Sequence, residues 1–223
     1  MRRVEWAVLV IVSAAFLLAA VAGRLPFSLT ETLGFVTGAV CVYLVVKEHI
    51  WNFPIGIANN LFFLVLFSEK RIYGDAGLQI VYVALGVHGW YSWLHGGMER
   101  KALKIEHASL KVLAISIGIV PPLTWILMEV LRRANGSAPL LDSFTTVLSL
   151  VAQYLLNRKY IENWYFWIVA DIIYIYLYIV RDLKLTAVLY FVFLCMCVAG
   201  FVHWRRLRQE AAIETPTLEP FAI

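Results

Sequence analysis

Cysteine is scarce in this sequence, and its placement excludes several kinds of site. The three cysteines, Cys41, Cys195 and Cys197, all lie inside apolar runs, and no CxxC spacing occurs. An odd number of cysteines within apolar runs argues against a disulfide framework, and the lack of paired thiolates argues against a structural zinc site. We therefore expect neither a metal site nor a bound cofactor.

Charge is scarce as well. Charged residues make up 15% of the 223 residues and hydrophobic residues 61%, whereas soluble domains are about a quarter charged. The mean hydropathy of +0.76 points the same way. The net charge of +4 comes from short basic clusters between apolar runs, as is typical of the segments that flank membrane helices. This pattern argues against a nucleic-acid partner and predicts an all-α integral membrane protein surrounded by the lipid bilayer.

Eight apolar stretches are candidates for membrane-spanning helices, which need about twenty residues each. They cover residues 6–22, 32–46, 50–68, 76–94, 112–131, 143–157, 163–180 and 185–204. Because the backbone must satisfy its own hydrogen bonds in lipid, helices are favoured over strands for all eight.

The two ends of the chain differ in character. Arg2 and Arg3 precede the first apolar stretch, so residues 1–28 could be a signal peptide, but the run is long for one and we favour a retained N-terminal helix, an uncleaved signal anchor. Residues 29–206 form the main membrane domain. Residues 207–223 contain two prolines and no apolar run, and we expect a disordered tail.

The distribution of Lys and Arg predicts the orientation. With a cytoplasmic N-terminus, 12 of the 19 Lys and Arg residues fall in inside segments and the other 7 fall outside. The positive-inside rule therefore favours both termini in the cytoplasm. Four of the inside charges lie between Gly96 and Lys111, a segment that we interpret as a cytoplasmic linker.

The first half of the chain resembles the second half after a shift of 111 residues. Besides apolar positions, this register aligns polar, glycine and tryptophan positions: Asn52 with Asn163, Gly89 with Gly200, Trp93 with Trp204, and Lys47 with Arg158. Apolar matches alone would carry little weight, but these indicate an internal repeat. The first repeat covers about residues 31–96, the second about residues 140–206, and residues 97–138 hold the linker and the fifth helix.

The repeat predicts where a solute would bind. Three spans plus one return the chain to its starting side, so the two units should point the same way about an axis along the membrane normal. Transporters with such parallel repeats bind solute between the units. The stretches 32–46 and 143–157 are the shortest and are equivalent in the repeat, which indicates the same place. Pro121 and Pro122 should kink the connecting helix. These features favour transport of a small solute.

Three side chains of the stretch 163–180 are the first candidates for solute contact. Asp171 is the one acid deep inside a span, where a carboxylate should face protein or water rather than lipid. Trp164 and Trp167 precede it at helical spacing, so all three share one face. Two indoles and a carboxylate suit a flat, cationic heterocycle. The alternatives are a structural partner role for Asp171 and an interfacial role for Trp164.

Amides and a tyrosine complete the candidate set. Its further members are Asn59, Asn60, Gln79, Gln153 and Tyr174. Amides can bind ribose hydroxyls or a carboxamide, and they can equally link helices. Asn60 is the repeat equivalent of Asp171, so both units place a polar group at that level, and Tyr174 is within reach of the same face.

Several short motifs are more specific than apolar composition. They are residues 53–59 (Phe-Pro-Ile-Gly-Ile-Ala-Asn), 78–79 (Leu-Gln), 89–93 (Gly-Trp-Tyr-Ser-Trp), and 162–167 (Glu-Asn-Trp-Tyr-Phe-Trp) followed by Asp171. The first three resemble the first half of the PnuC family of vitamin transporters, and the last resembles the second half. The resemblance extends from about residue 33 to residue 206. The architecture of the family is similar too: three helices, one connecting helix and three more, sometimes with an extra N-terminal helix.

The resemblance implies a function. It implies uptake of nicotinamide riboside across a bacterial inner (plasma) membrane by facilitated diffusion, with trapping by a separate cytoplasmic kinase. The substrate residues of the family map onto Trp164, Trp167, Asp171, Gln79 and Asn59. Nicotinamide riboside carriers of the family have Asn at the position of Asp171, where a carboxylate would favour a cation more strongly. Similar members carry thiamine or other vitamins, and thiamine is also cationic.

Three other functions are alternatives to vitamin transport by passive diffusion. A membrane enzyme would need paired acids or a nucleophile with a base, and Asp171 has no acidic partner within a span. A proton-coupled symporter would use Asp171 and His88. A scaffold would not need polar residues inside its spans. The vitamin carried, the coupling mode and whether the protein forms a homo-oligomer stay open at the level of sequence.

Overall fold

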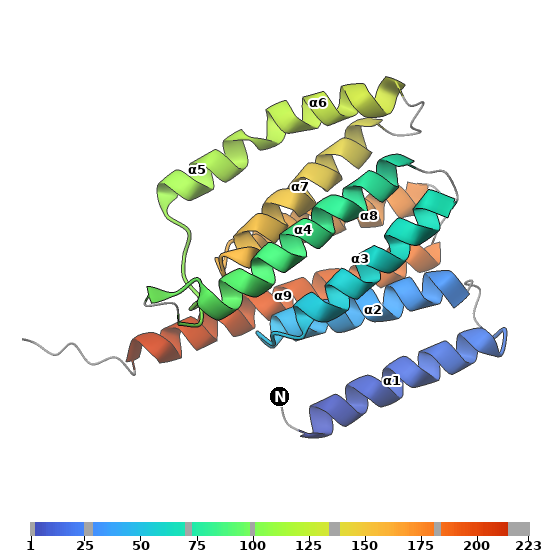
Figure 1. Ribbon diagram of the computed structural model, residues 1–223, viewed down its shortest axis with the longest axis horizontal. Coiled ribbons are helices and arrows are strands. Elements are labelled where there is room, and N and C mark those ends of the chain that lie inside the picture. Colours follow the sequence, from blue (N-terminus) through green and yellow to red (C-terminus); the bar gives the residue numbers. More distant parts are fainter. Residues whose placement is uncertain are drawn as a thin grey trace, which may run out of the picture.

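The protein is a bundle of helices. The computed structural model describes residues 3–24, 29–69, 73–98, 101–133, 139–180 and 184–213. In chain order, the helices are α1 (Arg3–Val21), α2 (Leu29–Val46), α3 (Asn52–Glu69), α4 (Tyr73–His95), α5 (Leu110–Gly118), α6 (Val120–Arg133), α7 (Pro139–Asn157), α8 (Asn163–Val180) and α9 (Lys184–Ile213). Figure 1 shows α1 on one flank of the bundle and α5 with α6 on the other.

All eight predicted helices are present, and the fifth is broken as its prolines predict. Helix α5 ends at Gly118 and α6 starts at Val120. Pro121 and Pro122 follow directly; proline has no backbone N–H and its ring clashes with the carbonyl four residues earlier. The carbonyls of Ile117 and Gly118 therefore lose their helical donors at this point, and the span bends there.

Helices α2 and α7 begin earlier than hydropathy predicts. They start at Leu29 and Pro139 and have 18 and 19 residues, whereas α3 and α8 have 18 each. The expectation that the second and sixth spans are the shortest is therefore wrong. Their first turns contain polar residues such as Asp142, which a search for apolar runs excludes although they are favourable at a helix N-terminus.

The last helix is longer than predicted. Helix α9 continues to Ile213, past the expected end at residue 204, because its final turns are polar and contribute nothing to an apolar signal. Residues 207–213 of the expected disordered tail are thus helical. Residues 214–223 lie outside the described residues.

Many of the helices have the length and composition of membrane spans. Among the described residues, five segments are long and apolar enough to cross a membrane: Val4–Val21, Leu110–Arg133, Pro139–Asn157, Asn163–Val180 and Ala187–Ala211. Two shorter apolar helices, Thr32–Val46 and Asn52–Leu66, belong to α2 and α3. This composition agrees with a multi-pass membrane protein.

Six helices form a closed ring. Around it, α2 contacts α3, α3 contacts α4, α4 contacts α7, α7 contacts α8, α8 contacts α9, and α9 returns to α2. We call α2–α4 the first unit and α7–α9 the second unit. The contacts between the units, α2 with α9 and α4 with α7, are equivalent under exchange of the two. Helices α1 and α6 pack outside the ring, against α2 and α7 respectively.

Reciprocal hydrogen bonds join the two units at one end of the ring. The indole Nε1 of Trp93 in α4 donates to the carbonyl of Leu156 in α7 at 3.0 Å, and Nε1 of Trp204 in α9 donates to the carbonyl of Val45 in α2 at 3.1 Å. Each residue of one bond is the 111-residue equivalent of a residue in the other. Helices α2, α4, α7 and α9 therefore reach the same end of the bundle, which is the arrangement that the repeat predicts.

Two glycines permit close packing at equivalent places. A Cβ on Gly89 would overlap Phe53 and Asn157, and a Cβ on Gly200 would overlap the indole of Trp164. The aromatic ring at position 53 or 164 thus lies directly against the last helix of its own unit.

Candidate functional site

A cavity of about 360 Å³ lies inside the ring of six helices. Small-molecule sites in proteins span roughly 300–1,000 Å³, so the volume suits a ligand of one or two rings. Residues of all six ring helices line the cavity, and among the residues that the structure describes none of the lining residues comes from α1, α5 or α6. The space between the two units that the repeat predicts is therefore present.

One face of α8 forms much of the cavity wall. Trp164, Trp167, Asp171 and Tyr174 all line the cavity. Their spacing of three, four and three residues follows the helical period, so a single stripe of α8 turns all four inward. Both α8 ends match the predicted stretch 163–180, because Asn163 and Val180 bound an apolar run with no polar overhang.

Asp171 is buried in this wall. Its residue is 6% exposed, and Oδ2 accepts a hydrogen bond from the Cys197 thiol of α9 at 3.4 Å. Within the part of the chain that the structure describes, Asp171 forms no ion pair and no Lys or Arg lines the cavity. The charge of a carboxylate in this position therefore has no cationic side chain beside it in the cavity wall, which favours a cationic ligand.

Trp164 combines packing with an unused donor. The residue is 1% exposed, and its ring lies edge-on to Trp204 with centroids 5.5 Å apart. Its Nε1 has no hydrogen-bond partner among the described residues. A buried N–H without an acceptor costs roughly 1–3 kcal/mol, so an acceptor on a ligand in the cavity would offset that cost.

The candidate amides differ in whether their donors are already used within the protein. Asn59 donates to the Thr37 hydroxyl and to the Gly34 carbonyl of α2 at 3.4 Å. The Gln153 Nε2 donates to Asn157 Oδ1 at 2.9 Å. Asn59 and Gln153 line the cavity, as does Asn60, but Asn59 already donates to a neighbouring helix and Gln153 to a residue of its own helix α7.

Gln79 is the one predicted site residue that does not line the cavity. Its place at the equivalent level of the second unit is taken by Tyr190, which does. Tyr190 packs against Tyr174 and Tyr178, with ring centroids 4.8 Å and 5.1 Å apart. An aromatic cluster therefore lies about one helical turn beyond Asp171, and Tyr174 and Tyr190 of this cluster line the cavity.

Sequence reasoning missed several other lining residues. They are Gly38, Cys41, Tyr82, Ser149, Phe193 and Cys197. Tyr82 and Phe193 are 111-residue equivalents, so the repeat register was a signal that could have found them as a pair. Gly38, Cys41, Ser149 and Cys197 gave no such signal, because their small side chains leave the cavity open without forming a recognisable motif.

Comparison with known proteins places the chain in a family. Residues 28–206 match the family described as nicotinamide mononucleotide transporter. The chain is 27% identical over 215 residues to the nicotinamide riboside transporter PnuC of Escherichia coli (strain K12), with 85% of this chain and 90% of that protein covered. It is 30% identical over 199 residues to PnuC of Neisseria mucosa, covering 82% and 74%.

A solved structure agrees with the sequence comparisons. The crystal structure of a vitamin B3 transporter PnuC superposes with a TM-score of 0.69 at 27% identity, over 94% of both chains. The ring fold, the cavity and the match across residues 28–206 lead to one conclusion. The chain belongs to the nicotinamide mononucleotide transporter family, a family of membrane transporters.

Proposed function

We propose that this protein carries nicotinamide riboside across the bacterial inner membrane by facilitated diffusion. The observation that carries the proposal is the cavity between the two units, in which Asp171 and Trp167 face the same space. The pyridinium ring of nicotinamide riboside is flat and cationic. An indole face attracts and stacks on such a ring, and the carboxylate complements its charge.

The charge of the cavity favours the riboside over the mononucleotide. A phosphate group would bring at least one full negative charge into a space whose described lining holds Asp171 and no Lys or Arg. Placing two anions in one poorly hydrated site is unfavourable. The relatives named for nicotinamide riboside support the same substrate.

Passive transport is favoured over proton coupling. A proton relay from Asp171 would need a second group that exchanges protons near neutral pH, such as a histidine, to face the cavity, and His88 is exposed on α4 and does not line it. Its ring Nδ1 lies 3.5 Å from Asn157 Nδ2 instead. Net uptake by a passive carrier requires the product to be trapped, which a separate cytoplasmic kinase would do by phosphorylation.

Thiamine is the alternative substrate. The observation that favours it is the Asp171 carboxylate in the cavity wall, because a carboxylate suits a cation more strongly than the Asn that the family resemblance implies at this position. Thiamine also combines a cationic ring with a second heterocycle, and the aromatic end of the cavity at Tyr174 and Tyr190 suits a second ring.

Calorimetric titration of the purified protein with nicotinamide riboside, thiamine and nicotinamide mononucleotide tests the proposal. We expect nicotinamide riboside to bind most tightly. Trp167→Ala should raise its Kd by roughly ten- to hundredfold, since stacking on an aromatic side chain is worth about 1–3 kcal/mol. Trp90→Ala is the matched control, because Trp90 is 38% exposed on α4 and lies outside the cavity wall.

Three outcomes would contradict the proposal. Tighter binding of thiamine would transfer it to the alternative substrate. Equal losses in Trp167→Ala and Trp90→Ala would place the site elsewhere. Uptake into liposomes that concentrates unmodified nicotinamide riboside under a proton gradient would replace facilitated diffusion by symport.

A further inference from the structure

Helices α2 and α7 end in the same unusual way. Glu48 after α2 and Lys159 after α7 have φ angles of 54° and 53°, and they are the non-glycine residues with positive φ in the described part of the chain. Each follows the pattern of a helix-terminating cap: His49 N donates to the Leu44 carbonyl, and Tyr160 N donates to the Leu155 carbonyl. Glycine is the favoured residue at such a position, yet this protein has a charged side chain at both.

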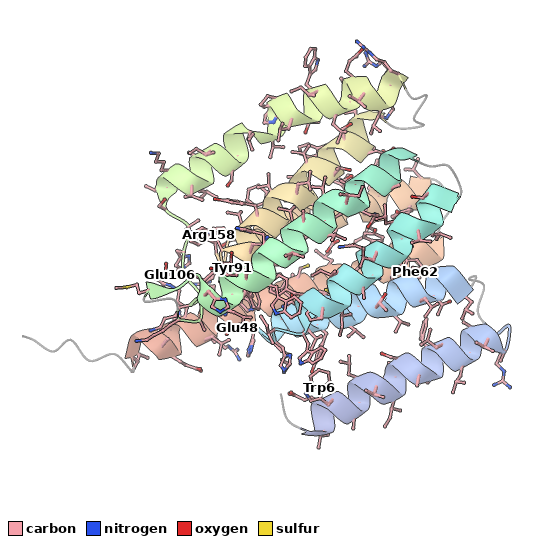
Figure 2. All side chains as sticks on the ribbon, in the orientation of Figure 1. Trp6, Glu48, Phe62, Tyr91, Glu106 and Arg158 are labelled. Atoms are coloured by element: carbon pink, nitrogen blue, oxygen red, sulfur yellow. The ribbon has the colours of Figure 1, made fainter. Side chains whose placement is uncertain are left out.

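The two charged side chains meet across the boundary between the units. Lys159 Nζ lies 2.5 Å from Glu48 Oε1. The lysine side chain is 7% exposed and that of the glutamate 28%, so the pair is largely shielded from water. Figure 2 shows Glu48 at the end of the bundle where Glu106 and Arg158 also lie. Glu48 and Lys159 are equivalent under the 111-residue shift, and they carry opposite charges. Trp93 and Trp204, another equivalent pair at this end, are identical residues.

Beneath this pair, four aromatic rings separate it from the cavity. Lys159 Nζ lies 4.5 Å from the ring centroid of Trp93. Trp93 contacts Phe53 at 5.0 Å and Trp204 at 5.9 Å between ring centroids, and Trp204 contacts Trp164. Phe53 and Trp164 in turn line the cavity.

The four rings form a plug that both units build. Phe53 and Trp93 come from the first unit, and Trp164 and Trp204 are their equivalents in the second. The contact between Trp93 and Trp204 crosses the boundary between the units, and the Glu48–Lys159 pair crosses it again on the outer side. A solute leaving the cavity through this end must part these contacts.

We propose that the Glu48–Lys159 ion pair is the latch of a gate, and that it holds the aromatic plug closed over this end of the cavity. Glu48 and Lys159 thus control access to the cavity without contacting the solute. The backbone conformation supports this proposal. A residue other than glycine in the left-handed region costs free energy, and the protein has such a residue at the end of both α2 and α7. In return, Glu48 and Lys159 form an ion pair between the two units. This inference deepens the proposed transport function.

The charged residues near this pair make other contacts, and these contacts do not join the two units. Lys47, one residue before Glu48, pairs with Glu5 of α1 at 3.1 Å, so it fastens a helix outside the ring. Glu162 accepts from His107 Nδ1 at 2.7 Å and from Ala108 N at 2.8 Å, so it fastens the linker to α8. Among the described ion pairs, the bond between Glu48 and Lys159 is the one that joins the first unit to the second.

Thiol labelling can measure the gate without any solute. Cys197 lines the cavity and is 4% exposed. In a background in which Cys41 and Cys195 are replaced by alanine, a membrane-impermeant methanethiosulfonate reagent reports access to Cys197. A tag after α9 marks the relevant membrane face, because Trp204 of α9 lies at the same end as Glu48.

We expect Lys159→Glu, which sets two carboxylates against each other, to raise the labelling rate from the tagged face by roughly fivefold or more, because the open population increases. The double variant Glu48→Lys with Lys159→Glu restores an opposite pair and should return the rate to within about twofold of the parent. Lys47→Glu is the matched charge reversal and should leave the rate unchanged.

The outcomes separate the latch from other roles. An unchanged rate in Lys159→Glu, equal acceleration from both membrane faces, or a double variant that labels as fast as the single one would overturn the proposal. If Lys159→Glu does not fold, Glu48→Gln provides the same comparison with a milder change. Because no solute is present, these results hold whether or not nicotinamide riboside proves to be the substrate.

Discussion

The first unit faces the cavity with Gly56 and Asn60, where the second unit has Trp167 and Asp171. The positions are equivalent and all four line the same space, so the difference lies in chemistry and not in geometry. The first unit supplies room and an amide, and the second supplies an indole and a carboxylate. The two copies of a repeat can therefore share one backbone arrangement while they contribute different side chains to a single site.

The frame that the two units share lies around the plug. Trp93 and Trp204 make the same indole-to-carbonyl bond to the opposite unit, and Asn52 and Asn163 donate to the carbonyl three residues earlier at 2.9 Å and 2.7 Å. Geometry that terminates and joins helices is thus retained in both copies. We infer that Asn60 differs from Asp171 because of what the ligand requires, and Glu48 from Lys159 because of what the gate requires.

The largest expected effect comes from removing the carboxylate that distinguishes the second unit. Asp171→Asn keeps the shape and removes the charge; at an effective dielectric constant of about 20, opposite unit charges about 4 Å apart attract by about 4 kcal/mol, part of which desolvation offsets. The Kd for nicotinamide riboside should rise by roughly ten- to hundredfold. The Kd for its uncharged dihydro form should change by less than about threefold, since no ion pair is lost. Titration of both ligands measures the difference.

A swap sharpens this comparison. In Asn60→Asp with Asp171→Asn, the carboxylate moves to the equivalent place in the first unit, away from Trp167. We expect the swap to recover less than half of the lost binding free energy, because charge and stacking then come from opposite walls. Full recovery would show that the two positions are interchangeable and that the division between the units is wrong.

The next effect tests whether the frame is shared. Gly89→Ala and Gly200→Ala each add a methyl group that overlaps a large ring, Phe53 or Trp164. Overpacking of this kind costs roughly 1–3 kcal/mol, and thermal melting of the purified variants should show losses of similar size. Gly77→Ala is the control, since its Cβ would meet nothing within 4 Å. A loss in only one of the two glycine variants would mean that the units are not built alike.

The sequence predicts the helices better than it predicts their ends. Long apolar stretches predicted all eight helices, and residues 163–180 coincide with α8, because its apolar run is bounded by polar residues on both sides. The extension of α9 to Ile213 was missed, since a polar helix beyond a span leaves no mark on hydropathy. The caps at Glu48 and Lys159 were missed for a different reason, as glycine is the residue that signals them.

Candidate site residues were predictable where they share a helix face. The stripe of Trp164, Trp167, Asp171 and Tyr174 follows from helical spacing alone, and the cavity wall contains all four. The bond of Asn59 to α2 could not be predicted, because it depends on how two helices pack. Whether these residues bind solute stays a prediction.

The smallest expected effect separates two glutamines that the sequence treats alike. Gln153 lines the cavity on α7, and Gln79 on α4 does not. A neutral hydrogen bond is worth about 0.5–1.5 kcal/mol, so Gln153→Ala should raise the Kd for nicotinamide riboside about two- to tenfold. Gln79→Ala should leave it unchanged within about twofold. Because Gln153 also bonds Asn157, melting temperatures must accompany the titrations to separate loss of contact from loss of stability. If Gln79→Ala weakens binding more than Gln153→Ala at equal stability, α4 must rotate when solute binds, and the first unit then contributes a second polar group that the empty cavity hides.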